Sequence, residues 1–135
     1  GRGLVATFVN GLRKNRQDYV KLLFKRTTRG WQDRIRDILD AIVEIQRFTR
    51  GMDYETFKED DKSIRAVEMN FIIIGEAANQ IPEEVEEKYT AIPWILMRAM
   101  RNRIVHVYFK VDEKLMWDTI QNDLPPLIPE LEKLL

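Results

Sequence analysis

The chain lacks cysteine altogether and has a single histidine among its 135 residues. Without cysteine, disulfide frameworks and cysteine metal centres are excluded, and the composition fits the reducing cytoplasm in which we expect the protein to act. No apolar run reaches the roughly 18 residues that a membrane span requires, so no membrane partner is expected. The sequence also has no alternating strand pattern and no internal repeats, which leaves helices as its structural units.

Apolar residues make up 44% of the chain, which is close to the globular average and excludes global disorder. They recur at helical spacing in four long segments, at residues 31–50, 61–80, from 93 onwards, and 113–135. Shorter helical turns are expected at 54–59 and 82–89. The pattern predicts an all-α fold, an antiparallel up-and-down bundle of four main helices plus short helical turns.

Two pairs of residues refine this outline. Leu39 and Val43 are expected to widen the apolar stripe of the first long segment. Pro125 and Pro126 are expected to kink or divide the last one, because proline interrupts the hydrogen-bond ladder of a helix.

Segment 61–80 is the most apolar, and it is predicted to be the central helix or to face a second subunit as well. It carries Glu76 between Gly75 and Ala77. Because burying an unpaired carboxylate costs several kcal/mol, Glu76 is expected to meet a cation or a helix N-terminus. Two roles stay open for it, a structural ion pair and a supporting part in chemistry.

Residues 1–30 are strongly basic although the whole chain is neutral. They carry eight Lys or Arg against one acid, a net charge of +7, which leaves −7 on residues 31–135. We expect a basic extension at 1–30 and a helical domain at 31–135. The extension has three interpretations: an arm that holds nucleic acid through phosphates, an arm that folds back on the acidic body, or a segment foreign to the native domain, since Gly1 is not a natural start.

The only histidine lies in the most informative stretch, residues 101–108. On a helix, Asn102 and His106 are i,i+4 neighbours and Arg103 and His106 are i,i+3 neighbours. Arg101 and Tyr108 are seven residues apart and share an adjacent stripe. One short helix would therefore present a fixed cation, an amide, an acid/base group and a phenol to a single patch.

This patch suits phosphate chemistry. A histidine among arginines has its protonated form disfavoured, so His106 is available as a base near neutral pH. The adjacent guanidinium groups of Arg101 and Arg103 suit a phosphate and the charge that develops on a phosphorane. No Asp/His cluster has metal-ligand spacing, so neither a metal nor a cofactor is expected. RNA is the indicated substrate, because its 2′-hydroxyl can attack the neighbouring phosphate with only a base, an acid and charge stabilisation.

The spacing Arg101-x4-His106-x-Tyr108 resembles the motif of HEPN domains, and it is most similar to the HepT-like toxins of MNT–HEPN toxin–antitoxin pairs. The resemblance covers residues 31–135 and includes, in the same order, further short segments at 74–78, 92–94, 100–103 and 122–127. It implies an HEPN-like helical bundle and a metal-independent endoribonuclease toxin of a type VII-like pair.

The resemblance also implies roles for single residues. Arg101 and His106 would be catalytic, in a composite cleft between the two copies of a homodimer, and Asn102 would orient or bind the substrate. Tyr108 matches the tyrosine to which the MNT nucleotidyltransferase antitoxin transfers AMP, which blocks the cleft. A homodimer also answers a need of the chemistry, because cleavage requires a base and an acid and one chain supplies one histidine.

A non-catalytic function is the alternative. A lone histidine in a helix is more often structural, and basic residues near a helix C-terminus suit the helix dipole. Tyr108 would then pack at the helix end and anchor it by its hydroxyl. On this interpretation the chain is an HEPN module that binds a nucleotide or a protein.

Overall fold

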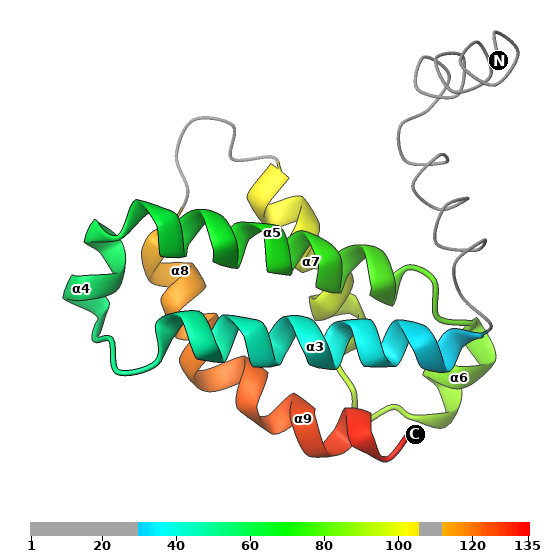
Figure 1. The fold of residues 1–135 in the computed structure, drawn as a ribbon. Helices are drawn as coiled ribbons and strands as arrows, with labels where there is room; N and C mark the ends of the chain where they lie inside the picture. The colour runs from blue at the N-terminus through cyan, green and yellow to red at the C-terminus, as the bar shows by residue number, and fades with distance from the viewer. Residues whose placement is uncertain (1–29, 106–111) are drawn as a thin grey trace, which may run out of the picture. The chain divides into compact units, whose positions relative to one another are not determined.

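The computed structural model describes residues 30–105 and 112–135, with side chains for all of these except 102–105. Contacts within the chain divide it after Gly30, and the unit Trp31–Leu135 is described by itself. Its described residues form helices and no strands, which confirms the predicted all-α bundle (Figure 1). In this part of the chain, no helix is long and apolar enough to cross a membrane. The predicted basic extension at 1–30 lies outside the described residues and stays a prediction.

The helices follow the predicted segments closely. In chain order they are α3 (Trp31–Thr49), α4 (Tyr54–Glu59), α5 (Asp61–Ala78), α6 (Glu83–Lys88), α7 (Trp94–Val105), α8 (Glu113–Asp118), the π-helical turn η1 (Thr119–Asp123) and α9 (Leu124–Glu132).

Glycine and aspartate define several of the helix ends. Gly51 follows α3 with φ +77°, a left-handed conformation that glycine adopts without a steric penalty. Asp53 caps the start of α4 by accepting a hydrogen bond from the Thr56 backbone N–H at 2.8 Å. Asp60 separates α4 from α5 and caps the latter through the Ser63 N–H.

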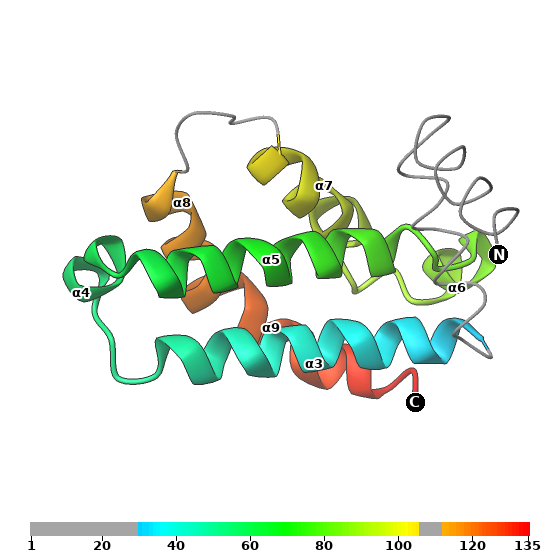
Figure 2. The ribbon, with the colours of Figure 1, turned by 45° about the horizontal axis from the view of Figure 1, so that its top comes forward.

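The central helix of the bundle is α5, as its apolar composition predicted. It packs against α3 along one side and against α7 along another, and α3 and α5 run antiparallel in both ribbon views (Figures 1 and 2). Helix α9 packs against α3, and α4 contacts α8. The predicted apolar stripes are buried at the positions Ile35, Ile38, Ile42 and Ile45 of α3 and Ile64, Val67, Phe71, Ile74 and Ala78 of α5.

The expectation that Val43 widens the stripe of α3 is wrong. Its side chain is 56% exposed, whereas Leu39 is partly buried against the core. Val43 follows the fully buried Ile42, so it lies about 100° further round the helix and beyond the edge of the core-facing side.

The last segment is divided, as its prolines predicted. Pro125 and Pro126 occupy the first turn of α9, where a missing backbone N–H has little cost, and the turn before them widens into η1. The division bends the chain without exposing its apolar side. The apolar residues at helical spacing in this segment are all buried, namely Trp117, Ile120, Leu124, Leu127, Leu131 and Leu134.

Candidate functional site

The predicted site residues fall at the C-terminal end of α7. Arg101 is described in full. Asn102 and Arg103 belong to the helix, but their side chains lie outside the described part, and so do His106 and Tyr108 entirely. The predicted roles of these four residues stay predictions, as does the catalytic role predicted for Arg101.

Glu76 and Arg101 form an ion pair between α5 and α7. The Oε1 atom of Glu76 lies 2.6 Å from Nε of Arg101, and the two side chains are only 8% and 18% exposed. Glu76 thus meets a cation, as its place among small residues predicted. Its partner is the arginine of the predicted catalytic motif, which connects the central helix of the bundle to the candidate site.

Gly75 allows the two helices to come together at this point, although the sequence pattern marks it only as a neighbour of Glu76. A Cβ atom added to Gly75 would lie 2.6 Å from Cβ of Arg101 and 3.1 Å from its backbone nitrogen. Such contacts are too short for any side chain, so glycine is required for this helix crossing. The available signal was the small residues around Glu76, which are typical of close helix packing.

Two further contacts hold the N-terminal half of α7. The Arg98 guanidinium pairs with the Glu86 carboxylate, which joins α7 to α6. The indole N–H of Trp94 donates a hydrogen bond to the backbone carbonyl of Tyr89 at 3.1 Å. Together with the Glu76–Arg101 pair, these contacts join α7 to both α5 and α6.

The ion pair with Glu76 holds the Arg101 side chain in place at this end of α7. A guanidinium group has five N–H donors in one plane, and the pair with Glu76 runs through Nε. A partly buried arginine held in this way is preorganised, so less side-chain entropy is lost when an anion binds.

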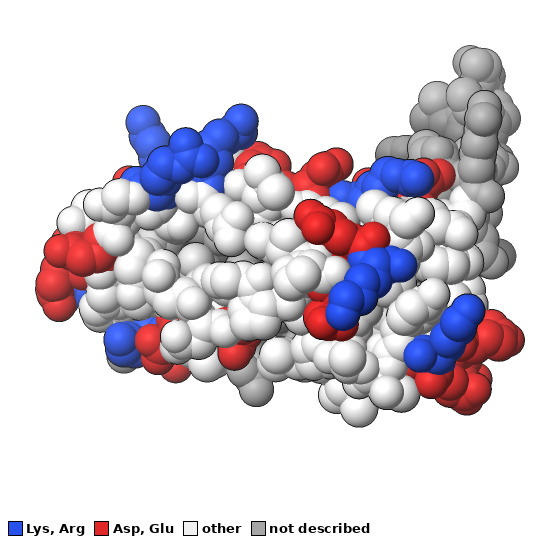
Figure 3. Space-filling model, turned by 90° about the horizontal axis from the view of Figure 1, so that it is seen from below, with Lys and Arg blue, Asp and Glu red and all other residues white. Residues whose placement is uncertain are grey.

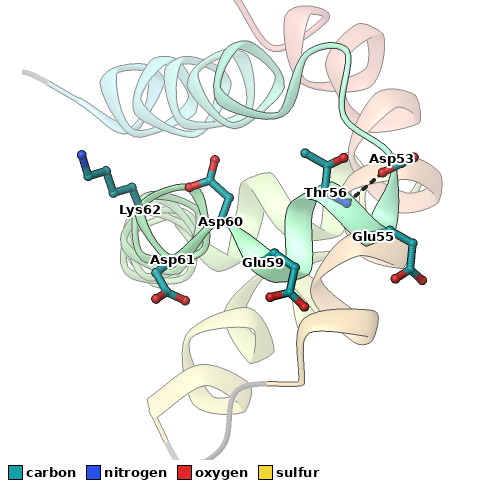
Figure 4. A pocket seen from close by; sticks show the side chains of 7 residues that line it. All are labelled: Asp53, Glu55, Thr56, Glu59, Asp60, Asp61 and Lys62. Carbon is teal, nitrogen blue, oxygen red and sulfur yellow. Dashed lines mark hydrogen bonds between the residues drawn. The ribbon is translucent and has the colours of Figure 1, made fainter.

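An acidic hollow lies at the junction of α4 and α5, away from the motif residues in the sequence. It is lined by Asp53, Glu55, Thr56, Glu59, Asp60, Asp61 and Lys62 (Figure 4). Hydrogen bonds from the Thr56 backbone to Asp53, and from the Ser63 backbone to Asp60, lower the pKa of each carboxyl group. Both aspartates are thus explained by helix capping. In the described ranges, no three His, Cys, Asp or Glu side chains are placed to hold a metal ion.

Replacing Asp60 by asparagine is expected to remove part of the acid sensitivity of the fold. The pKa of Asp60 is lowered on folding, so its ionised form stabilises the fold above about pH 4, and this stabilisation is lost as the pH falls through the folded pKa. Asparagine is a comparable N-cap that does not titrate. The Tm of Asp60→Asn should therefore change less between pH 7 and pH 3 than that of the wild type. Asp60→Ala should lower Tm at pH 7 as well, and an unchanged pH dependence in the Asn variant would contradict this role.

On the face shown in Figure 3, blue and red atoms lie side by side in several places around a broad uncharged area, and one group at the upper left is almost entirely blue. Several of the exposed pairs are local to one helix, such as Arg36 with Asp33 at 2.7 Å and Lys133 with Glu130 at 3.0 Å. These cations are engaged by neighbouring carboxylates, which distinguishes them from a phosphate-binding stripe.

Comparison with known proteins bears on the same region. The family model described as "Ribonuclease HepT-like" matches residues 38–134. A "Probable ribonuclease HepT" of Thermococcus cleftensis is 40% identical over 106 residues, which are 78% of this chain and 96% of that protein. A "Putative RNase" of Methanocaldococcus jannaschii is 34% identical over 73% of this chain and 82% of its own length. A "Putative RNase" of Caldanaerobacter subterraneus subsp. tengcongensis is 30% identical over 82% of this chain and 96% of its own length. No solved structure matches the chain significantly.

Proposed function

This chain belongs to the HepT-like ribonuclease family, and on that premise we propose that it is a metal-independent endoribonuclease of the toxin type. The observation that supports the proposal best is the buried Glu76–Arg101 pair, which holds a guanidinium group five residues before the only histidine. An arginine fixed in this way is suited to stabilise charge on a reacting phosphate.

In the proposed reaction, His106 removes the proton from an RNA 2′-hydroxyl. The 2′-oxygen then bonds to the adjacent phosphorus, and the bond from phosphorus to the 5′-oxygen breaks. An acid returns a proton to this leaving oxygen, so the products are a 2′,3′-cyclic phosphate and a 5′-hydroxyl. Arg101 stabilises the negative charge of the phosphorane, while Asn102 and Arg103 bind and orient the substrate.

A homodimer supplies both the base and the acid. The chain has one histidine, so a two-fold axis near His106 brings a second His106 and a second Arg101 into one cleft. Met69 suits a surface beside this cleft. It lies seven residues before Glu76, on the same stripe of α5, and its side chain is 58% exposed.

Met69→Lys is expected to dissociate the dimer. Losing the burial of one methionine costs about 1.5 kcal/mol or more. Both copies of the chain lose it, so the binding free energy of the dimer weakens by about 3 kcal/mol and its Kd should rise at least about 10²-fold. Sedimentation velocity at micromolar concentration measures the change. Ile95→Lys is the matched control, because Ile95 is 78% exposed at the opposite end of α7. A monomeric wild type would rule out the composite cleft, and a dimeric Met69→Lys would place the interface elsewhere.

The proposed partner is an MNT-type nucleotidyltransferase antitoxin, which silences the chain at Tyr108. In this step the phenol oxygen attacks the α-phosphate of ATP, pyrophosphate leaves, and the phenol proton is released. The attached AMP places a phosphate near Arg101 and a bulky base in the cleft, so RNA is excluded.

Tyr108→Phe is expected to retain ribonuclease activity and to escape silencing by such a partner with ATP. Intact mass spectrometry should show an AMP-sized increase on the wild type and none on the Phe variant. An equal increase on both would place the modification at another residue. If Tyr108 only anchors the helix end, silencing persists and the Tm of the variant falls.

Purified chain incubated with an RNA and with a DNA of the same sequence tests the proposed function. RNA should be cleaved to cyclic-phosphate ends in the presence of EDTA, and DNA should stay intact because it lacks the 2′-hydroxyl. Activity that is lost on chelation and restored by magnesium would overturn the mechanism. RNA that is bound without being cleaved would identify a non-catalytic binding module.

A further inference from the structure

We infer that Gly75 and Glu76 together form a cradle that fixes Arg101 before RNA binds, so that Glu76 is a positioning residue of the cleavage site. The inference rests on the proposed function and adds to it a part of the central helix α5. Gly75 receives the stem of Arg101, and Glu76 holds its guanidinium group.

The burial of the pair separates it from the other ion pairs of the described helices. Glu76 and Arg101 are 8% and 18% exposed, whereas Glu86 and Arg98 are 19% and 32% exposed. Arg34 is only 6% exposed, but its partner Asp37 is 35% exposed, so Glu76–Arg101 is the pair among these in which both side chains are largely buried. A buried pair gains little stability over well-packed apolar residues, because both charges must leave water. We therefore assign to this pair the role of holding the Arg101 side chain in one position, rather than that of stabilising the fold.

The contact through Nε fixes the orientation of the guanidinium group. The ion pair is made at Nε, which belongs to the guanidinium plane, so a carboxylate oxygen 2.6 Å from Nε restricts the movement of the whole group. The N–H groups that bind a phosphate lie in this same plane. Because the plane is already held in place, less side-chain entropy is lost when the phosphate binds.

The Gly75 contact fixes the position from which the side chain starts. With 2.6 Å between an added Cβ and the Cβ of Arg101, any larger residue would push α7 away from α5. Arg101 would move with α7, and so would the motif residues that follow it in the chain. Gly75→Ala should therefore reduce cleavage about 10²-fold, the scale expected for a misplacement of about 1 Å.

Two readouts test the cradle, and one of them needs no activity. In the wild type, the Arg101 Nε–H should give a resolved NMR signal that exchanges slowly with water, because Nε lies 2.6 Å from a buried carboxylate oxygen and the side chain is only 18% exposed. Glu76→Ala should accelerate this exchange and lower kcat about 10²-fold. Glu76→Gln retains an oxygen acceptor, so its exchange rate and its kcat should lie between those of the wild type and those of Glu76→Ala. Glu86→Gln is the matched control, because Glu86 lies on α6 and pairs with Arg98 of the same helix α7, and it should affect neither Arg101 exchange nor kcat.

A double variant separates positioning from a direct catalytic role. If Glu76 acts only through Arg101, Glu76→Gln should cost nothing further in an Arg101→Lys background. Glu76→Gln with wild-type exchange and wild-type kcat would overturn the inference. A wild type that cleaves no RNA would overturn the proposed function instead, and the exchange of the Arg101 Nε–H would still decide whether the cradle exists.

Discussion

His106→Ala is expected to lower RNA cleavage by about 10²–10⁴-fold or below detection, because the variant loses both the base and the acid of the composite cleft. The fold should persist, since the buried core of the described helices is formed by other residues. Single-turnover cleavage measures the chemical step, and thermal unfolding followed by circular dichroism checks the fold.

The pH profile supplies the control for this variant. A wild type that uses one histidine as base and another as acid should show a bell-shaped dependence of kcat/KM near neutral pH. The chain has only this histidine, so the bell should vanish in the variant. A His106→Ala protein that keeps the rate and the pH profile of the wild type would remove His106 from the mechanism.

The fold could be predicted from the sequence because its signals are local. The stripe Ile35, Ile38, Ile42 and Ile45 has helical period, Gly51 and Asp60 mark helix ends, and each signal lies within the element that it defines. The burial of Val43 was predicted wrongly, because the sequence shows the centre of the apolar stripe but not how far the buried side of the helix extends on either side of it. The π-helical form of η1 could not be foreseen either, since proline predicts an interruption but not its geometry.

Of the candidate site, the sequence predicted that Glu76 needs a charged partner, but not which residue this partner is. The identity of Glu76, an acid among small apolar residues, predicts that it meets either a cation or a helix N-terminus. Its partner Arg101 lies 25 residues away on another helix, so the pairing depends on how α5 and α7 cross. That crossing depends in turn on the Gly75 contact, which becomes visible only when the two backbones are in place.

Arg101 offers the second large effect, and its substitutions separate catalysis from stability. Arg101→Ala removes the cation beside a carboxylate that is only 8% exposed. It should lower cleavage by about 10²–10⁴-fold and also destabilise the fold by about 3 kcal/mol, because Glu76 is left without this cation. The expected fall in Tm is more than about 10 °C for a domain of this size.

Arg101→Lys keeps a positive charge opposite Glu76 but lacks the planar fork that recognises a phosphate. Its Tm should therefore stay near that of the wild type, while cleavage still falls about 10²-fold. Arg98→Lys, three residues earlier on α7 and paired with Glu86, is the matched control and should leave cleavage unchanged. If Arg101→Lys cleaves RNA like the wild type, a point charge is sufficient and the oriented guanidinium is not needed. If both Arg101 variants lose activity only in proportion to Tm, the pair with Glu76 is structural and the catalytic cation must be another residue.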